Sequence, residues 1–352
     1  MKIGDRLHLQ GSFDKDSFAF LRQMGADGLT VNISSGLKGN PTGPSVLPED
    51  TVQRLVSGDH WHKDDLLALR EVCEAHGLEL NALAHTPEHR WHEIFTGGAR
   101  RDELCDHWCR SLEAMREAGI PVLQYWWVSN QGAAHRNWHT DVAIPIRGGA
   151  RAEGFDMAKA RAIETRREPL YAEEQLWETL EYFLRRVIPV AQSCGVRMAM
   201  HPSDPQVPML NGMPRILRSP EAFDRMLEIV PSSSNAINFC QGCFSQMLSA
   251  EGVYAAIAHF LRRDAIAYVH FRNVSPDSRP DRFTEAFWDE GKVDMPRAMR
   301  AYQQGGYTGY LAPDHHPHVV GDTLWGHRSR GFALGYMRGL KQSLPAPAAP
   351  AH

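Results

Sequence analysis

The chain has 352 residues, of which 43% are hydrophobic and 23% charged, and its formal net charge is -4. This is the composition of an ordinary globular protein with enough residues to bury a full core. The mildly acidic balance and the lack of a basic run argue against a nucleic-acid partner. No apolar run approaches the roughly 20 residues needed to span a bilayer, and the first residues lack a signal-peptide pattern. We therefore expect a cytoplasmic protein that binds neither nucleic acid nor membrane.

One local pattern recurs along the chain: an amphipathic helix, then a glycine, then a short apolar strand. Glycine is favoured directly after a helix because, without Cβ, it adopts the left-handed conformation at little cost. The pattern predicts helices at 18–24, 66–76, 112–118, 176–187 and 298–304. Together with similar apolar runs, it predicts strands at 2–7, 29–31, 78–83, 122–126, 196–200, 236–240, 265–271 and 310–313.

Near-continuously apolar strands that alternate with helices indicate parallel strands, buried on both faces by crossover helices. Eight such units in a chain of this length predict an α/β fold, the (β/α)8 TIM barrel. We expect one catalytic domain at 1–344 and a disordered Pro/Ala tail at 345–352. A doubly wound open sheet is the alternative, although no Gly-x-Gly-x-x-Gly follows the first strand to favour a dinucleotide-binding version.

Three connections are too long to be simple turns, at 32–64, 128–169 and 274–293. Each follows a predicted strand. In a barrel they would be long loops on the C-terminal face, where barrel enzymes carry their active sites.

Four consecutive predicted strands end near a side chain that can bind a metal ion. In chain order these residues are His201, Cys240, His270 and Asp314. Because C-terminal strand ends converge at the mouth of a barrel, we expect the four side chains to lie together. A lone histidine or cysteine is more often a packed residue, but the set of four predicts a site for Mn²⁺, Fe²⁺, Co²⁺ or Zn²⁺ rather than Ca²⁺.

The sequence Cys240-Gln241-Gly242-Cys243 leaves two other interpretations open. A structural zinc site would need a second close pair, and Cys105 and Cys109 on a charged helix are a weak candidate. A redox Cys-x-x-Cys motif is compatible with its position after a strand. Redox chemistry needs both sulfurs, whereas a metal site needs Cys240 alone.

Several polar and aromatic residues are candidates for handling an acidic, hydroxylated substrate. Arg272 faces the same side as His270 and could hold a carboxylate, with a barrel ion pair as the alternative. Arg147 lies in a glycine-rich part of the longest connection and is a substrate-binding candidate or a residue of a solvated loop. His315 is a candidate acid/base residue because its ordinary pKa is near neutrality. Trp126 is either a sugar-stacking platform or a packing residue.

These motifs resemble the mannonate dehydratase family, sugar-acid dehydratases of the xylose-isomerase-like TIM-barrel group. The resemblance rests on His-Pro-Ser-Asp-Pro at 201–205, Pro-Arg-Ile at 214–216, Asn-Phe-Cys-Gln-Gly at 238–242 and Val-His-Phe-Arg-Asn-Val at 269–274. It continues in Phe-x-Asp-Glu-Gly-x-x-Asp-Met at 287–295 and Pro-Asp-His at 313–315, with weaker support from Arg-Gly-Gly-Ala at 147–150. All of the chain except the tail is covered.

The resemblance implies a hydro-lyase that converts D-mannonate to 2-keto-3-deoxy-D-gluconate in hexuronate catabolism. It implies manganese bound by four residues, His201, Cys240, His270 and Asp314, with His315 as an acid/base residue. The ion would stabilise enolate-like charge as a Lewis acid, while Arg272 fixes the substrate carboxylate. A metal-dependent sugar isomerase or epimerase on the same barrel, and a catalytically silent sugar-acid-binding barrel, are the alternatives. A homo-oligomer is compatible with the sequence.

Two departures from the family pattern bear on the site. Family members often read His-Pro-Asp-Asp-Pro where this chain has Ser203. Some also carry a catalytic tyrosine shortly after the Asp-His pair, whereas here the next tyrosine is Tyr336, inside the predicted terminal helix. His327 and Trp325 are candidate replacements for it, and a divergent branch acting on another sugar acid is an alternative.

Overall fold

The computed structural model describes residues 1–33, 43–128 and 139–345. Its centre is a closed barrel of eight parallel strands in the order β1-β14-β11-β10-β7-β4-β3-β2. The strands are β1 (Lys2–His8), β2 (Gly28–Asn32), β3 (Glu79–Ala84), β4 (Val122–Tyr125), β7 (Arg197–Met200), β10 (Asn235–Cys240), β11 (Ile266–His270) and β14 (Tyr310–Ala312). The predicted TIM barrel is thereby confirmed, and the open-sheet alternative is wrong.

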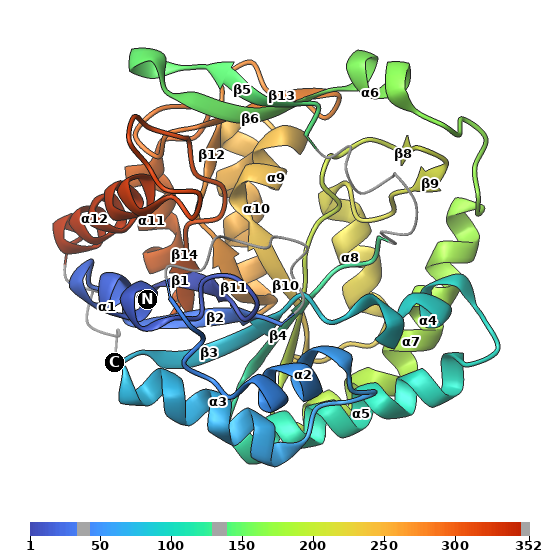
Figure 1. Cartoon of the computed structure of the whole chain (residues 1–352). Helices are drawn as coiled ribbons and strands as arrows, with labels where there is room; N and C mark the ends of the chain where they lie inside the picture. The colour runs from blue at the N-terminus through green and yellow to red at the C-terminus, as the bar shows by residue number, and fades with distance from the viewer. Residues whose placement is uncertain (34–42, 129–138, 346–352) are drawn as a thin grey trace, which may run out of the picture.

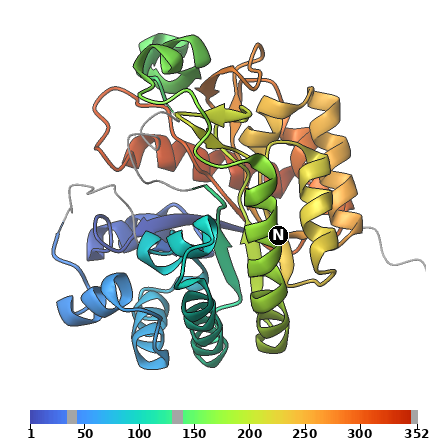
Figure 2. The ribbon, with the colours of Figure 1, turned by 90° about the vertical axis from the view of Figure 1, so that its right-hand side faces the viewer.

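Helices surround the barrel and bury the outer face of its strands. They include α1 (Lys15–Gln23), α3 (Lys63–Ala75), α5 (Arg101–Ala118), α7 (Glu173–Cys194), α8 (Pro220–Ile229), α10 (Ala250–Arg262), α11 (Met295–Gln304) and α12 (His327–Ser343). Figure 2 shows α3 (blue), α5 (teal), α7 (green), α8 (yellow) and α10 (orange) standing side by side. Every residue of β2, β10 and β11 is buried, which explains their lack of an exposed polar face.

The helix–glycine–strand pattern corresponds to real helix ends. Helix α5 ends at Gly119 with φ 69° and α7 ends at Gly195 with φ 66°. In both cases the glycine N–H donates to a carbonyl of the last helical turn, as expected of a left-handed cap. The chain then turns directly into β4 or β7.

The long connections contain secondary structure that was not predicted. Strands β5 (Asp141–Pro145), β6 (Arg151–Asp156), β12 (Asn273–Val274) and β13 (Arg282–Ala286) form an antiparallel sheet in the order β12-β13-β6-β5. Two of these connections therefore pair with each other although more than 100 residues separate them. Figure 1 shows the sheet at the top of the view, with α6 (Met157–Ile163) beside it.

The remaining short elements complete the connections between barrel strands. They are α2 (Glu49–Ser57), η1 (Glu88–Arg90), α4 (His92–Thr96), η3 (Arg147–Gly149), β8 (Met209–Leu210), β9 (Met213–Pro214) and α9 (Gln241–Met247). Parts of the predicted connections at 32–64 and 128–169, and 346–352 of the predicted tail, lie outside the described residues. None of the helices in the described ranges is long and apolar enough to cross a membrane.

A buried ion pair attaches the last helix to the first strand. Asp5 of β1 is fully buried, and its Oδ1 lies 2.5 Å from Nη1 of Arg330 on α12. The same guanidinium lies over the ring of Trp325 and donates from Nε to the carbonyl of that residue at 2.7 Å. The pair therefore fixes α12 against the barrel.

We expect Asp5→Asn to destabilise the protein by about 3–5 kcal/mol, because loss of one partner leaves the Arg330 charge buried without its counter-ion. The matched control is Glu79→Gln, which removes a carboxylate that pairs with Lys2 at the surface and should cost at most about 1 kcal/mol. Urea unfolding of both variants measures the difference. Equal losses would show that the buried pair does not fix α12.

Candidate metal centre and its surroundings

The four predicted ligands lie together at the C-terminal ends of their strands. His201 follows β7 directly, Cys240 and His270 end β10 and β11, and Asp314 lies two residues beyond β14. One ligand atom from each side chain lies within 4.8 Å of those of the other three. Cys240 is fully buried, and His270 and Asp314 are each 7% exposed. The geometry is that of a candidate metal-binding group.

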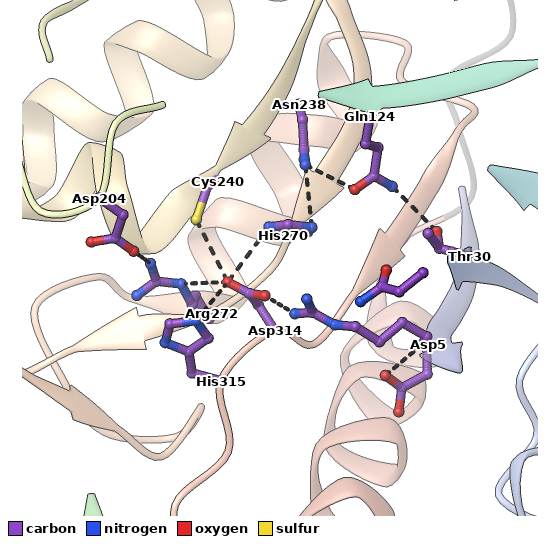
Figure 3. A network of polar contacts seen from close by, with 12 residues as sticks. Asp5, Thr30, Gln124, Asp204, Asn238, Cys240, His270, Arg272, Asp314 and His315 are labelled. Atoms are coloured by element: carbon purple, nitrogen blue, oxygen red, sulfur yellow. Dashed lines mark hydrogen bonds and ion pairs between the residues drawn. The ribbon is translucent and has the colours of Figure 1, made fainter. Parts of the chain in front are cut away.

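The Asp314 carboxylate is the point on which these side chains converge (Figure 3). Its Oδ2 lies 3.0 Å from Nε of Arg272, 3.5 Å from Nδ1 of His270 and 3.9 Å from Sγ of Cys240. Its Oδ1 contacts Nη2 of Arg6. One buried carboxylate is therefore shared by two guanidinium groups, an imidazole and a thiol.

Both histidines have one nitrogen engaged outside the cluster. Nδ1 of His201 donates to the carbonyl of Pro202 at 2.7 Å, so its Nε2 keeps the lone pair. Nε2 of His270 lies 3.2 Å from the side-chain amide of Asn238, while its buried Nδ1 has no hydrogen-bond partner among the described residues. Nδ2 of Asn238 also donates to Oε1 of Gln124 at 3.0 Å, so a half-turn of both amides together would place the Asn238 oxygen on Nε2 and leave the lone pair on Nδ1. Two nitrogens, a sulfur and an oxygen fit a borderline divalent ion.

The electrostatic environment favours the protonation states that metal ligands require. Burial alone would raise the pKa of the Cys240 thiol, but the hydrogen bond with Cys243 and the charges of Arg272 and His201 hold it well below its ordinary value. Burial lowers the pKa of His270 to about 3, against an opposing effect of Cys240. Both shifts favour a thiolate beside a neutral imidazole, the forms in which these side chains bind metal ions.

Behind His270 a chain of amides runs across the barrel interior (Figure 3). The Asn238 amide lies 3.0 Å from that of Gln124, which lies 3.2 Å from Oγ1 of Thr30. All three side chains are buried. This chain fixes the ring orientation of His270, as outer hydrogen-bond partners do at metal sites. The sequence analysis did not single out these three residues, although a polar residue inside a predicted buried strand can indicate such an interior contact.

Arg272 is enclosed by acidic residues and is only 1% exposed. Its Nη2 lies 2.9 Å from Asp204, its Nη1 2.7 Å from Glu285 and its Nε 3.0 Å from Asp314. Burial would lower the pKa of Arg272, but Cys240, Glu285 and the other neighbouring anions raise it well above its ordinary value. The structure thus shows the ion-pair arrangement, and a contact with a substrate carboxylate stays a prediction. Asp204 supplies a carboxylate beside the position of Ser203.

His315 lies between two carboxylates. Its Nδ1 lies 3.0 Å from Oε1 of Glu285, and its Nε2 lies 3.5 Å from Oδ2 of Asp314. Burial would lower the pKa of His315, but Glu285 raises it above its ordinary value. Sequence reasoning missed Glu285 because β13 was taken for part of a loop. The acid/base role of His315 stays a prediction.

A second group of possible ligands lies against His315. Its members are His139, Glu153 and His315, and one ligand atom of each lies within 4.8 Å of those of the other two. His139 lies two residues before β5, and Glu153 belongs to β6. Neither His139 nor Glu153 was singled out in the sequence, because both belong to a long connection that was expected to be a loop. That connection contributes β5 and β6 to the antiparallel sheet β12-β13-β6-β5, which we call the insertion sheet.

The other predicted substrate contacts, Arg147 and Trp126, have partners other than the four candidate ligands. Arg147 pairs with Asp289 at 2.6 Å and Glu290 at 3.1 Å, and its guanidinium lies over the ring of Phe287. Trp126 packs edge-on against His85. Both residues line a pocket that contains none of the four candidate ligands; its other lining residues are Thr86, Trp91, Trp108, Tyr125 and Trp127. Their substrate roles stay predictions.

Arg6 was missed by the sequence reasoning although it contacts Asp314. Its side chain is 16% exposed, and burial together with the charge of Arg330 lowers its pKa to about 10. Arg6 could have been identified from the sequence, because a charged residue inside a predicted buried strand usually has a charged partner. The two suggested replacements for a family tyrosine, His327 and Trp325, pack against each other and against Phe20.

The D-mannonate dehydratase (UxuA) family model matches residues 10–171 and 160–349. The chain belongs to the D-mannonate dehydratase family. The resemblance drawn from its motifs is thereby confirmed. Mannonate dehydratase 2 of Halalkalibacterium halodurans is 30% identical over 307 residues, which cover 80% of this chain and 85% of that protein. Mannonate dehydratase 1 of Bacillus licheniformis is 28% identical over 82% of this chain and 85% of its own.

One solved structure of a mannonate dehydratase agrees with this assignment, and a more distant one shares the fold. The crystal structure of mannonate dehydratase from Streptococcus suis serotype 2 matches with a TM-score of 0.79 and 26% identity, over 97% of this chain and 93% of the other. D-psicose 3-epimerase from Clostridium cellulolyticum H10 matches with a TM-score of 0.57 and 12% identity, over 97% and 99% of the two chains. At that identity the second likeness concerns the fold alone.

Removing the thiolate tests the ligand set against the redox interpretation. We expect Cys240→Ser to weaken metal binding by more than the roughly 10–100-fold typical of losing an outer partner. The matched control is Cys243→Ser, which should retain the metal. Metal content after dialysis, measured by mass spectrometry, checks both. Full metal content in Cys240→Ser would show that the proposed site is wrong.

Removing the amide behind His270 tests the outer partner. Asn238→Ala should lower metal affinity by roughly 10–100-fold, because the ring of His270 loses the group that orients it. Asn235→Ala is the control, since this residue of the same strand donates to carbonyls of Met226 and Val230 instead. Titration calorimetry with Mn²⁺ compares the two. A similar loss of affinity in both would indicate a general loss of stability.

Proposed function

We propose that this protein is a metal-dependent dehydratase that removes water from an aldonic acid. D-mannonate is the proposed substrate, and 2-keto-3-deoxy-D-gluconate the product. One observation carries the proposal: in a member of this family, four ligand side chains from consecutive barrel strands lie within 4.8 Å of one another at the catalytic face. Mn²⁺ is the proposed ion, with Fe²⁺, Co²⁺ and Zn²⁺ as alternatives of similar ligand preference.

The reaction needs three things from the site. The proton beside the carboxylate must be removed, the charge that develops must be stabilised, and the hydroxyl at C3 must leave as water. A divalent ion, when bound, supplies Lewis-acid stabilisation of the negative charge. Arg6 and Arg272 pair with the carboxylate of Asp314, the one carboxylate among the four candidate ligands.

His315 is the proposed proton-transfer residue beside the metal group. Glu285 fixes its Nδ1 at 3.0 Å and so sets the orientation of the ring. The opposite nitrogen, Nε2, then faces the candidate ligand Asp314. A proton on this atom is close to any hydroxyl group that reaches the site.

The substrate contacts are proposed from the earlier candidates. Arg272 would have to exchange one of its three carboxylate partners for that of the substrate. Arg147 would likewise have to leave Asp289, and Trp126 would offer the edge of the aromatic pocket. We also propose a single catalytic domain at 1–344 and a cytoplasmic location.

Incubation with Mn²⁺ and a panel of aldonic acids tests the function. We expect D-mannonate to yield a 2-keto-3-deoxy acid lighter than the substrate by one water. Chelation should abolish turnover, and added Mn²⁺ should restore it. A product with the same mass as the substrate would favour the alternative hypothesis of an isomerase or epimerase. No dehydration of any acid by the metal-loaded protein would overturn the proposal.

A further inference from the structure

A second carboxylate–imidazole pair lies against His315. Nδ1 of His139 lies 3.3 Å from Oε2 of Glu153. The ring centre of His139 lies 5.1 Å from that of His315, with the planes at 73°. His315 is itself paired with Glu285, so two histidines, each held by its own glutamate, meet beside the candidate metal centre.

The other nitrogen of His139 has no partner among the residues that the structure describes. The side chain is 12% exposed, and its Nε2 is buried without a hydrogen-bond partner in the parts of the chain that the structure describes. Leaving a buried polar atom unsatisfied destabilises the folded state. A carboxylate on Nδ1 holds the proton there and leaves the lone pair on Nε2, the arrangement of an imidazole ready to accept a proton.

A second metal ion at this group fits the geometry less well. Both nitrogens of His315 already face carboxylates, that of Glu285 at 3.0 Å and that of Asp314 at 3.5 Å. A second ion would therefore have only His139 and Glu153 as ligands not committed elsewhere. Two ligands are fewer than the three protein ligands typical of catalytic sites.

We propose that His139, positioned by Glu153, is a second proton-transfer residue of the elimination. It takes the proton from C2 of the substrate, while His315 protonates the departing C3 hydroxyl. The inference rests on the proposed function. Each such proton transfer typically contributes a factor of roughly 100 to 10,000 to the rate.

The two histidines balance the protons of the complete reaction. The C2–H electron pair forms the C2=C3 bond, the C3–O bond breaks, and the hydroxyl leaves with a proton from His315 as water. The enol then becomes the ketone by gaining a proton at C3 and losing one from the C2 oxygen. His139 returns its proton to C3, and His315 accepts the other, so both residues end in their starting states.

Hydrogen exchange at C2 in D₂O separates the two roles. We expect His139→Gln in the full-length, Mn²⁺-loaded protein to lose both water elimination and deuterium incorporation at C2 of recovered substrate, by roughly 100-fold or more. His315→Gln should lose elimination but keep C2 exchange. Glu153→Gln should slow exchange without changing metal content. His259→Gln is the matched control, because Nε2 of His259 lies 2.9 Å from Asp224 on the outer helices; it should behave as wild type.

Metal content and thermal unfolding of each variant complete the test. C2 exchange by His139→Gln at the rate of His315→Gln would overturn the proposal, and so would unimpaired elimination. Loss of one equivalent of metal in His139→Gln would make the group a metal site and also overturn it. If the wild type dehydrates a sugar acid but His139→Gln does too, only this inference fails. If the wild type neither dehydrates nor exchanges any acid, the proposed function fails with it.

Discussion

The arrangement of the barrel mouth depends on one buried carboxylate, that of Asp314. An ionised carboxylate without partners is too costly to bury, and here two guanidinium groups, those of Arg6 and Arg272, offset its charge. Arg272 is buried and the side chain of Arg6 is only 16% exposed, so removing any one member would leave poorly solvated charge without its counter-ion. The thiol of Cys240 and the ring of His270 then pack against the same oxygen. Charge pairing thus defines the position that a cation could occupy.

The insertion sheet supplies what the barrel strands do not. Glu285 of β13 pairs with Arg272 and His315, and Glu153 of β6 pairs with His139. Because β13 and β6 are neighbouring strands, both glutamates are delivered to the same side of the mouth. The barrel carries the candidate metal ligands, and the sheet carries the acidic partners of the two histidines. The chemistry we propose lies where these two layers meet.

Family membership and the local geometry bear on different questions. Relatives at 28–30% identity and the matching family model place the chain in the D-mannonate dehydratase family, but the choice among sugar acids depends on side chains around the mouth. Trp126 and Arg147 are engaged with protein partners there. His327 and Trp325, the sequence-based candidates for a missing acid/base residue, pack beside Phe20 instead. His139, for which we propose an acid/base role, lies beside His315.

The sequence by itself determined the barrel and the candidate ligand set, because both follow from local patterns. Glycine caps and apolar strands identify parallel βα units, and ligands at strand ends meet in any closed barrel. Tertiary structure decided which partners those residues have. Arg6 lies in a predicted strand, but its contact with Asp314 depends on the pairing of β1 with β14 at the other end of the chain. Glu285 and His139 lie in or beside short strands of mixed composition, which give no periodic signal. Only the tertiary structure shows that three carboxylates surround Arg272, because no sequence pattern indicates the number of partners of a guanidinium.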